Sequence, residues 1–259
     1  MAAADPWEHL RRHTAARIAL GRAGASLPTA EWLRFGVAHA RARDAVHLPL
    51  DGETLAAQLR EQAFEVVQIE SAADDRATFL RRPDLGRRLS PRSAALLAQT
   101  AAPVCDLAVV LGDGLSALAA NRHALPLLLE LRPRLEVERV SIGPVALARQ
   151  CRVALGDEAG AALKARAVLV LLGERPGLSS PDSLGAYLSW TPAPGLADSQ
   201  RNCVSNIRPD GLGYAEAARK IAWLVVEARR IGATGVLLKD RSDSPTLTVV
   251  PGAFGTIGE

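Results

Sequence analysis

The segment AVLVLLGERPGL, residues 167–178, constrains the fold of this chain more than any other part of its sequence. Its first six residues are apolar and include β-branched valines, which predicts a strand buried on both faces, as in a parallel sheet covered by helices. Open α/β sheets bind ligands at the carboxyl ends of their strands. Glu174 follows this strand, and a Pro-Gly pair then turns the chain back. We therefore expect Glu174 to lie in a binding loop.

Strand and helix patterns alternate along the chain at the spacing of βαβ units. Apolar runs predict strands near 64–71, 107–111 and 137–142, and helical periodicity predicts helices over 51–62, 92–100, 115–131, 157–165 and 214–231. The composition is 48% hydrophobic but only 4% aromatic, so the core is expected to consist of Ala, Leu and Val. We predict an α/β fold with a Rossmann-like, mostly parallel sheet flanked by helices.

The chain of 259 residues is long enough for a small domain attached to a larger one. Residues 1–50 are predicted to form a helical N-terminal domain, with helices near 5–18 and 29–46, and with about residue 80 as an alternative boundary. Residues 51–240 are predicted to form the Rossmann-like domain. After Asp240 the sequence contains turn-forming residues without helical periodicity, so residues 241–259 are predicted to be a flexible tail.

The charge is nearly balanced, but its distribution is uneven. With 31 basic and 28 acidic residues, a formal net charge of +3 and an isoelectric point near 9.0, the chain is not predicted to bind nucleic acid. Arginines nevertheless crowd the N-terminal helices. They indicate either a solvated helical face with acids nearby or a surface that docks on an acidic partner protein. The arginines concerned are Arg11, Arg12, Arg17, Arg22, Arg34, Arg41 and Arg43.

The remaining composition argues against several classes of protein. Cys105, Cys151 and Cys203 are widely spaced and form no CxxC pair, so neither a disulfide framework nor a structural zinc site is predicted. No apolar run approaches the roughly 18 residues of a membrane-spanning helix, and the first residues lack the pattern of a signal peptide. We expect a soluble, intracellular protein with no metal centre and no membrane partner.

The segment LAVVLGDGLSA carries a competing motif. Gly112, Gly114 and Ala117 satisfy the pattern G-x-G-x-x-G/A between a predicted strand and a predicted helix, which is the context of a nicotinamide site. The acid that binds the ribose should close the next strand, yet the nearby glutamates stand at the beginning of that predicted strand. The other interpretation is a tight strand-to-helix turn in which Asp113 or Ser116 caps the helix.

Six segments together carry a likeness to a known family. In order they are TAARIALGRAG (14–24), LPTAEWLRFGVAHARARDAV (27–46), RRPDLGRRL (81–89), GDGLS (112–116), GERPGL (173–178) and RNCVSNI (201–207). With this order and content, the chain from about Trp7 to Val236 resembles the small subunit of ethanolamine ammonia-lyase. No single segment assembles an acid, a base and a nucleophile, which suits a subunit that holds a cofactor.

The resemblance implies an ammonia-lyase that converts ethanolamine into acetaldehyde and ammonia with adenosylcobalamin. In that family a TIM-barrel large subunit holds the substrate and the catalytic residues, while the small subunit covers the cobalamin from the other side. The resemblance therefore implies a hetero-oligomer with no catalytic residue on this chain. It places the cobalamin contacts at Val153 in CRVALGD, Glu174 in GERPGL and Cys203 in RNCVSNI.

Three further expectations concern the cofactor, the location and the alternatives. The D-x-H-x-x-G signature is absent, so the cofactor's own dimethylbenzimidazole is expected to stay on cobalt, the base-on form. The expected location is the cytoplasm, with a protein-shelled bacterial microcompartment as the alternative. Two other functions stay open: an NAD(P)-dependent oxidoreductase that uses the turn from Gly112 to Ala117, and a non-enzymatic interaction domain that uses the arginine-rich helices.

Overall fold

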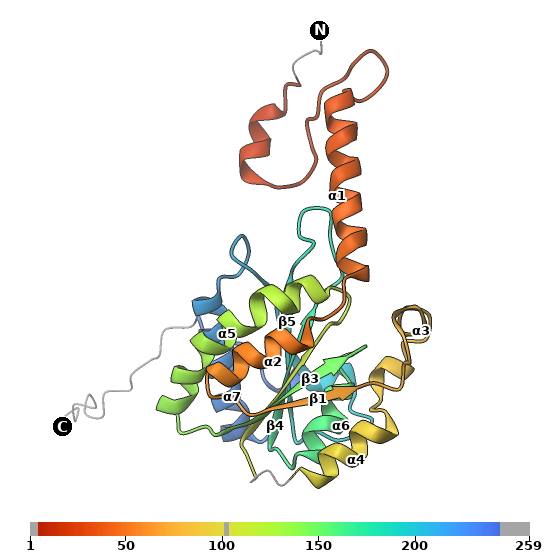
Figure 1. Ribbon diagram of the computed structural model, residues 1–259. Coiled ribbons are helices and arrows are strands. Elements are labelled where there is room, and N and C mark those ends of the chain that lie inside the picture. Colours follow the sequence, from red (N-terminus) through yellow and green to blue (C-terminus); the bar gives the residue numbers. More distant parts are fainter. Residues whose placement is uncertain (1–4, 101–103, 244–259) are drawn as a thin grey trace, which may run out of the picture.

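The computed structural model describes residues 5–100 and 104–243, and its centre is a sheet with the strand order β1-β3-β2-β4-β5-β6 (Figure 1). The strands are β1 (Val66–Glu70), β2 (Leu107–Gly112), β3 (Ile142–Arg149), β4 (Ala167–Gly173), β5 (Leu184–Trp190) and β6 (Arg201–Ile207). Every residue of β2 and β4 is buried, as the apolar runs predict. The predicted α/β class is confirmed.

The sheet is less parallel than predicted. β1, β3, β2 and β4 pair in parallel, whereas β5 runs antiparallel to β4 and β6 runs antiparallel to β5. The reason lies in the connections. A parallel neighbour needs a crossover of about a dozen residues or more, usually a helix. The segments between β4 and β5 and between β5 and β6 are short, and contain at most the 3-10 turn η3 (Asp198–Gln200).

Helices cover the sheet on two faces. One face packs against α2 (Gly52–Glu61), α5 (Ala117–Val137) and α7 (Tyr214–Ile231), through a core that includes Leu59, Leu127 and Ile221. The other, here called the α6 face, packs against α4 (Pro91–Gln99) and α6 (Leu155–Ala162). Leu97 and Leu155 fill its core. Ser90 caps α4 by accepting a hydrogen bond from the backbone of Ser93, at the start of the helix predicted over 92–100.

The boundary between α5 and β3 differs from the prediction. The predicted strand over 137–142 is wrong, because α5 continues to Val137 and β3 begins only at Ile142. Pro133 interrupts the sequence signal just after the helix predicted over 115–131, although α5 also contains Pro126. The helix persists because buried Leu128, Leu131 and Leu135 recur at helical spacing along its packed side. Val137 is 81% exposed, so it belongs to no buried strand.

The N-terminal region stands apart from the sheet. α1 (Thr29–His47) projects away from the layers and has Ala45 as its one buried residue (Figure 1). It confirms the helix predicted over 29–46. The helix predicted over 5–18 is reduced to the 3-10 turn η1 (Glu8–His13), which has no buried residue. A short helix that packs on no other element is marginally stable in water, which explains why only a short 3-10 turn forms here.

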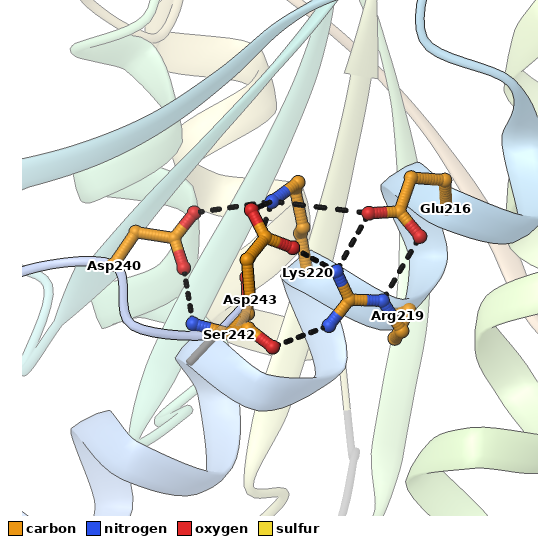
Figure 2. Close-up of polar contacts among 6 residues, drawn as sticks. All are labelled: Glu216, Arg219, Lys220, Asp240, Ser242 and Asp243. Atoms are coloured by element: carbon orange, nitrogen blue, oxygen red, sulfur yellow. Dashed lines mark hydrogen bonds and ion pairs between the residues drawn. The ribbon is translucent and has the colours of Figure 1, made fainter. Parts of the chain in front are cut away.

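Three short elements and a polar network complete the described chain. α3 (Arg76–Arg81) and the turn η2 (Leu85–Arg87) lie between β1 and α4, and η4 (Gly235–Leu237) follows α7. Beyond η4 the chain returns to α7, where Asp243 pairs with Arg219 and Lys220 (Figure 2). Arg219 also donates to the Ser242 carbonyl at 2.6 Å. The predicted flexible tail, 241–259, lies outside the described residues from position 244 onward.

Among the helices in residues 5–100 and 104–243, none combines the length and apolar character required to cross a lipid bilayer. The same residues contain no group of three or more His, Cys, Asp and Glu side chains arranged to hold a metal ion.

Candidate cofactor-binding surface

Glu174 stands directly after β4, at the edge of the sheet where the parallel strands end. Its backbone N–H donates to the Ser183 carbonyl at 2.9 Å, which extends the pairing of β4 and β5 by one residue. Its side-chain Oε2 accepts hydrogen bonds from the Ser183 hydroxyl and from the Asn206 backbone N–H, the latter at 3.2 Å. Oε1 accepts none from the described residues. One carboxylate oxygen therefore fixes the side chain, and the other stays available to a donor.

The free oxygen of Glu174 lies over β5. A Cβ atom built on Gly185 would stand 3.1 Å from Glu174 Oε1 and 3.1 Å from the Tyr187 hydroxyl oxygen. Tyr187 is paired with Cys203 across β5 and β6, so both side chains point to the same face of the sheet. We call Glu174, Gly185, Tyr187 and Cys203 the β5–β6 surface. It lies on the α6 face, where Tyr187 packs against the edge of the core.

The β5–β6 surface is partly exposed, with Glu174 and Tyr187 half-buried and Gly185 buried, and it carries neutral polar groups beside one carboxylate. Cys203 is exposed overall. Partial burial of its thiol, and then the neighbouring Glu174 carboxylate, raise the pKa of Cys203. Burial likewise raises the pKa of Tyr187, with Cys203 and Glu174 as further causes. Both groups therefore stay protonated at neutral pH, and Cys203 offers a small, weakly polar contact instead of a thiolate.

Val153 lies in the turn between β3 and α6. It is half-buried and packs against the core of the α6 face, as Tyr187 does from β5. The turn is fixed by the Val153 carbonyl, which accepts from the Gly156 backbone N–H at 3.0 Å. The three residues named by the sequence thus lie on one face of the sheet. Glu174 and Val153 follow the carboxyl ends of β4 and β3, whereas Cys203 lies within β6, beside Tyr187.

Sequence reasoning missed four residues that shape this surface. Ser183 and Asn206 orient Glu174, and Gly185 and Tyr187 form the floor beside Cys203. Their roles depend on β5 being antiparallel, which sets Tyr187 opposite Cys203. The positions of Gly185 and Tyr187, two residues apart in one strand, indicate that they share a face of the sheet. The residues opposite them can be identified only when the neighbouring strand and its register are known.

The turn that carries the glycine motif, Gly112 to Ala117, packs against other segments of the chain and leaves no room beside Gly114. A Cβ on Gly114 would stand 2.3 Å from the Gly173 carbonyl oxygen, because the turn packs directly on the end of β4. Asp113 accepts from the backbone N–H groups of Gln150 and Cys151 at 3.0 and 2.9 Å, and it pairs with Arg76. The turn thus serves close packing of the chain, which disfavours a pyrophosphate there.

The helix cap expected in this turn is not formed. Ser116 occupies the N-cap position of α5 without a side-chain cap, and its hydroxyl instead donates to the Pro181 carbonyl at 2.8 Å. Asp113 points toward the end of β3, as its hydrogen bonds show. β3 itself ends at Arg149, so the ribose-binding acid of a dinucleotide site is missing there as well.

The fold and this surface define an α/β protein with a polar surface next to the carboxyl ends of its parallel strands. Comparison with known families then identifies it. Residues 4–239 match the model of the ethanolamine ammonia-lyase light chain family. This chain belongs to that family.

Individual relatives agree with the family match. The chain is 54% identical over 246 residues to the ethanolamine ammonia-lyase small subunit of Ralstonia nicotianae, an alignment that covers 94% of this chain and 91% of the relative. It is 55% identical over 242 residues to the small subunit of Azotobacter vinelandii, with 92% and 90% covered. The Xanthomonas campestris pv. campestris small subunit is 55% identical over 246 residues, with 94% and 90% covered. The similarity therefore extends over both chains nearly in full.

Proposed function

We propose that this chain is the small subunit of an adenosylcobalamin-dependent ethanolamine ammonia-lyase, which converts ethanolamine into acetaldehyde and ammonia. The observation that carries the proposal is the family match over residues 4–239, together with relatives of that name at 54–55% identity. The chain takes part in the reaction as one subunit of a hetero-oligomer. We expect the catalytic residues on the large subunit.

The β5–β6 surface fits one side of a corrin. Cobalamin is a broad disc with amide groups around its rim, so its site needs an open apolar area and a few acceptors and donors that set its orientation. Glu174 Oε1 is free to accept from such an amide, and Gly185 lets Glu174 and Tyr187 lie close over β5. Cys203 and Val153 add neutral contact area. When bound, the cofactor supplies the radical chemistry, while this chain supplies position and exclusion of water.

Exposed apolar side chains in the N-terminal region support the proposal of a partner subunit. α1 exposes large apolar side chains, among them Trp32 at 66% and Leu33 at 55%. Several large apolar side chains exposed together on one helix indicate an interface. The segment before α1 also touches the loop that carries Glu174, since Arg17 Nη2 donates to the Leu178 carbonyl at 3.3 Å. A large subunit seated on α1 would therefore lie close to the loop between β4 and β5 (Figure 1).

The positions of the histidines support base-on cobalamin. His123 lies on α5, and its Nδ1 stands 2.8 Å from the Tyr214 hydroxyl, on the sheet face opposite the β5–β6 surface. The other four histidines belong to η1 and α1. We therefore expect dimethylbenzimidazole to remain on cobalt. A cytoplasmic location, free or within a microcompartment, stays a prediction.

Coexpression with the large subunit encoded in the same organism tests the proposal. The purified pair should show a corrinoid absorption spectrum after incubation with adenosylcobalamin, and it should form acetaldehyde from ethanolamine. Absence of both, or turnover of a substrate by this chain alone, would reject the proposed function. Electron paramagnetic resonance of the cob(II)alamin form, with ¹⁵N-histidine in the protein, tests the base-on prediction. A change of the nitrogen hyperfine splitting on labelling would contradict it.

A further inference from the structure

Three arginines from segments far apart in the sequence converge beside the proposed cobalamin contacts. Arg152 precedes Val153, Arg175 follows Glu174, and Arg87 ends η2. The segments RRPDLGRRL, CRVALGD and GERPGL supply one arginine each. The resemblance to the family assigns no role to the arginines of RRPDLGRRL. The convergence of Arg87 on Arg152 and Arg175 is seen only in the folded chain.

Close packing fixes η2 against the turn before α6. The Arg152 backbone N–H donates to the Gly86 carbonyl at 2.8 Å. A Cβ on Gly86 would stand 2.9 Å from Arg152 Cγ and 2.8 Å from the Phe79 ring, so no larger residue fits there without a shift. Arg87, the next residue, is therefore held next to the Arg152 side chain. Its own side chain is exposed.

The phenyl ring of Phe79 packs against the guanidinium groups of two arginines, Arg152 and Arg76. The Arg152 guanidinium lies over this ring at 4.3 Å from its centroid, and that of Arg76 lies at 4.8 Å. Arg76 is already committed, because it pairs with Asp113 at 3.3 Å and donates to the Gly114 carbonyl at 2.9 Å. Asp113 in turn accepts from two backbone N–H groups. The hydrogen bonds of Asp113, the buried acid of this region, are thus made to Arg76 and to backbone groups.

The other three arginines lack a counter-ion within the described chain. In residues 5–100 and 104–243, no carboxylate lies within ion-pair distance of Arg87, Arg152 or Arg175, and Arg152 Nε is buried without a hydrogen-bond partner. Burial, followed by the positive charges of Arg76, Arg87 and Arg175, lowers the pKa of Arg152. Like charges gathered in this way are unfavourable unless an anion joins them.

We propose that Arg87, Arg152 and Arg175 form a phosphate-binding site, and that its ligand is the phosphodiester in the nucleotide loop of cobalamin. This inference rests on the proposed function. Guanidinium groups match the oxygen geometry of a phosphate, and they bind it with charge-assisted hydrogen bonds. Cobalamin is otherwise mostly neutral, and its nucleotide arm leaves the rim of the corrin. Arginines adjacent to Val153 and Glu174 stand where such a rim would lie.

Substitution of the two exposed arginines tests the site without disturbing the packing around Phe79. Arg87→Gln, Arg175→Gln and the double variant are each assembled with the large subunit. The probes are adenosylcobalamin and adenosylcobinamide, which lacks the nucleotide loop and its phosphate, and binding is measured by equilibrium dialysis. Each single variant should bind adenosylcobalamin about three- to tenfold more weakly, as expected for one partly exposed charge-assisted contact. Binding of adenosylcobinamide should not change.

Arg88→Gln is the matched control. Arg88 is exposed, follows Arg87 directly, and lies in extended backbone after η2. Its substitution should leave both affinities unchanged. Added salt should weaken adenosylcobalamin binding less steeply in the double variant than in the wild type, because fewer charges take part.

Each other result has a defined meaning. Unchanged adenosylcobalamin affinity in the double variant would overturn the phosphate site and leave the proposed function intact. An equal loss for both probes would also overturn it, because the arginines would then act on the corrin or on the fold. Loss of subunit assembly on size-exclusion chromatography would assign the cluster to an acidic surface of the large subunit instead. Failure of the wild-type pair to bind either probe would reject the proposed function together with this inference.

Discussion

The carboxylate of Glu174 accepts a hydrogen bond from the backbone N–H of Asn206, 3.2 Å away, and so joins the end of β4 to β6 across the strand between them. Asn206 adopts a left-handed backbone conformation, with φ of 58°, which asparagine tolerates better than most residues. Together with Ser183, this bond fixes the carboxylate by its Oε2 atom. The orientation of Oε1 above β5 follows from that arrangement.

Loss of the Glu174 carboxylate should affect the cofactor more than the substrate. We expect Glu174→Ala to weaken adenosylcobalamin binding to the assembled enzyme by about tenfold, the equivalent of one hydrogen bond to a charged group. Equilibrium dialysis gives this affinity, and steady-state kinetics give the KM for ethanolamine. Glu61→Ala, at an exposed position on α2, is the control and should change neither. A larger effect on the KM for ethanolamine than on cofactor affinity would contradict the assigned role.

The positions that Glu174 and Tyr187 adopt over Gly185 should be needed for ligand binding. The Cβ of Gly185→Ala would stand 3.0 Å from Tyr187 Cε2 and 3.1 Å from Glu174 Oε1, so both side chains must shift. We expect weaker adenosylcobalamin binding with little change in the free energy of unfolding, because alanine in a strand offsets the tight contact by about 0.5–1 kcal/mol. Spectroscopic titration and urea denaturation measure the two quantities.

Gly213 provides the comparison for this variant. No atom lies within 4 Å of a Cβ built on Gly213, so Gly213→Ala should leave cofactor binding unchanged. If Gly185→Ala bound adenosylcobalamin as tightly as Gly213→Ala does, the β5–β6 surface would not be in contact with the corrin.

Features encoded locally could be predicted from the sequence. β4 was predictable because its residues are apolar on both faces, and Glu174 followed because polar residues and a Pro-Gly pair come directly after it. α7 was predicted at its observed bounds, since its apolar residues recur at helical spacing. These signals lie within a few residues of the element that they specify.

Features that depend on distant pairing could not be predicted in this way. The reversal at β5 and the register that sets Tyr187 opposite Cys203 arise from contacts between strands. The convergence of Arg87 on Arg152 likewise depends on how η2 packs, since the two residues are far apart in the sequence. The extension of α5 beyond residue 131, through Pro133, was hidden because proline is unfavourable inside a helix, while tertiary packing outweighs that cost here.

Exposed apolar residues on α1 should contribute to assembly and little to folding. Trp32 is 66% exposed, so Trp32→Ser should leave the free energy of unfolding of this chain nearly unchanged. Size-exclusion chromatography of the coexpressed subunits should show weakened assembly. Val137→Ser is the matched control, because Val137 is even more exposed but lies at the end of α5. Assembly of Trp32→Ser at the level of Val137→Ser would exclude this part of α1 from the interface.

The ion pairs on α7 should order a short segment without stabilising the whole fold. Arg219 and Lys220 both bind Asp243, in contact with solvent (Figure 2). Such pairs contribute little to the free energy of unfolding because water and salt screen them. Arg219→Gln should therefore increase hydrogen exchange at residues 241–243, while thermal denaturation stays nearly unchanged. Unaltered exchange in this segment would show that the network does not hold it.

The stability of the chain should fall in mildly acidic solution because of His123. Burial lowers the pKa of His123, and this effect outweighs the attraction of Asp182, whose Oδ2 lies 3.4 Å from Nε2. Arg122, which also pairs with Asp182, acts in the same direction as burial. The folded chain thus keeps His123 neutral where the unfolded chain already binds a proton, at and below a pH of about 6.5. The unfolded state then binds more protons, so the free energy of unfolding decreases as the pH falls through this range.

Urea denaturation of the full chain at several pH values between about 5 and 8 measures this dependence. His123→Gln removes the titrating group, so the difference in unfolding free energy between wild type and variant should shrink as the pH falls. His39→Gln, at an exposed position on α1, serves as the control, and its pH dependence should parallel that of the wild type. Parallel curves for His123→Gln and the wild type would disprove the prediction.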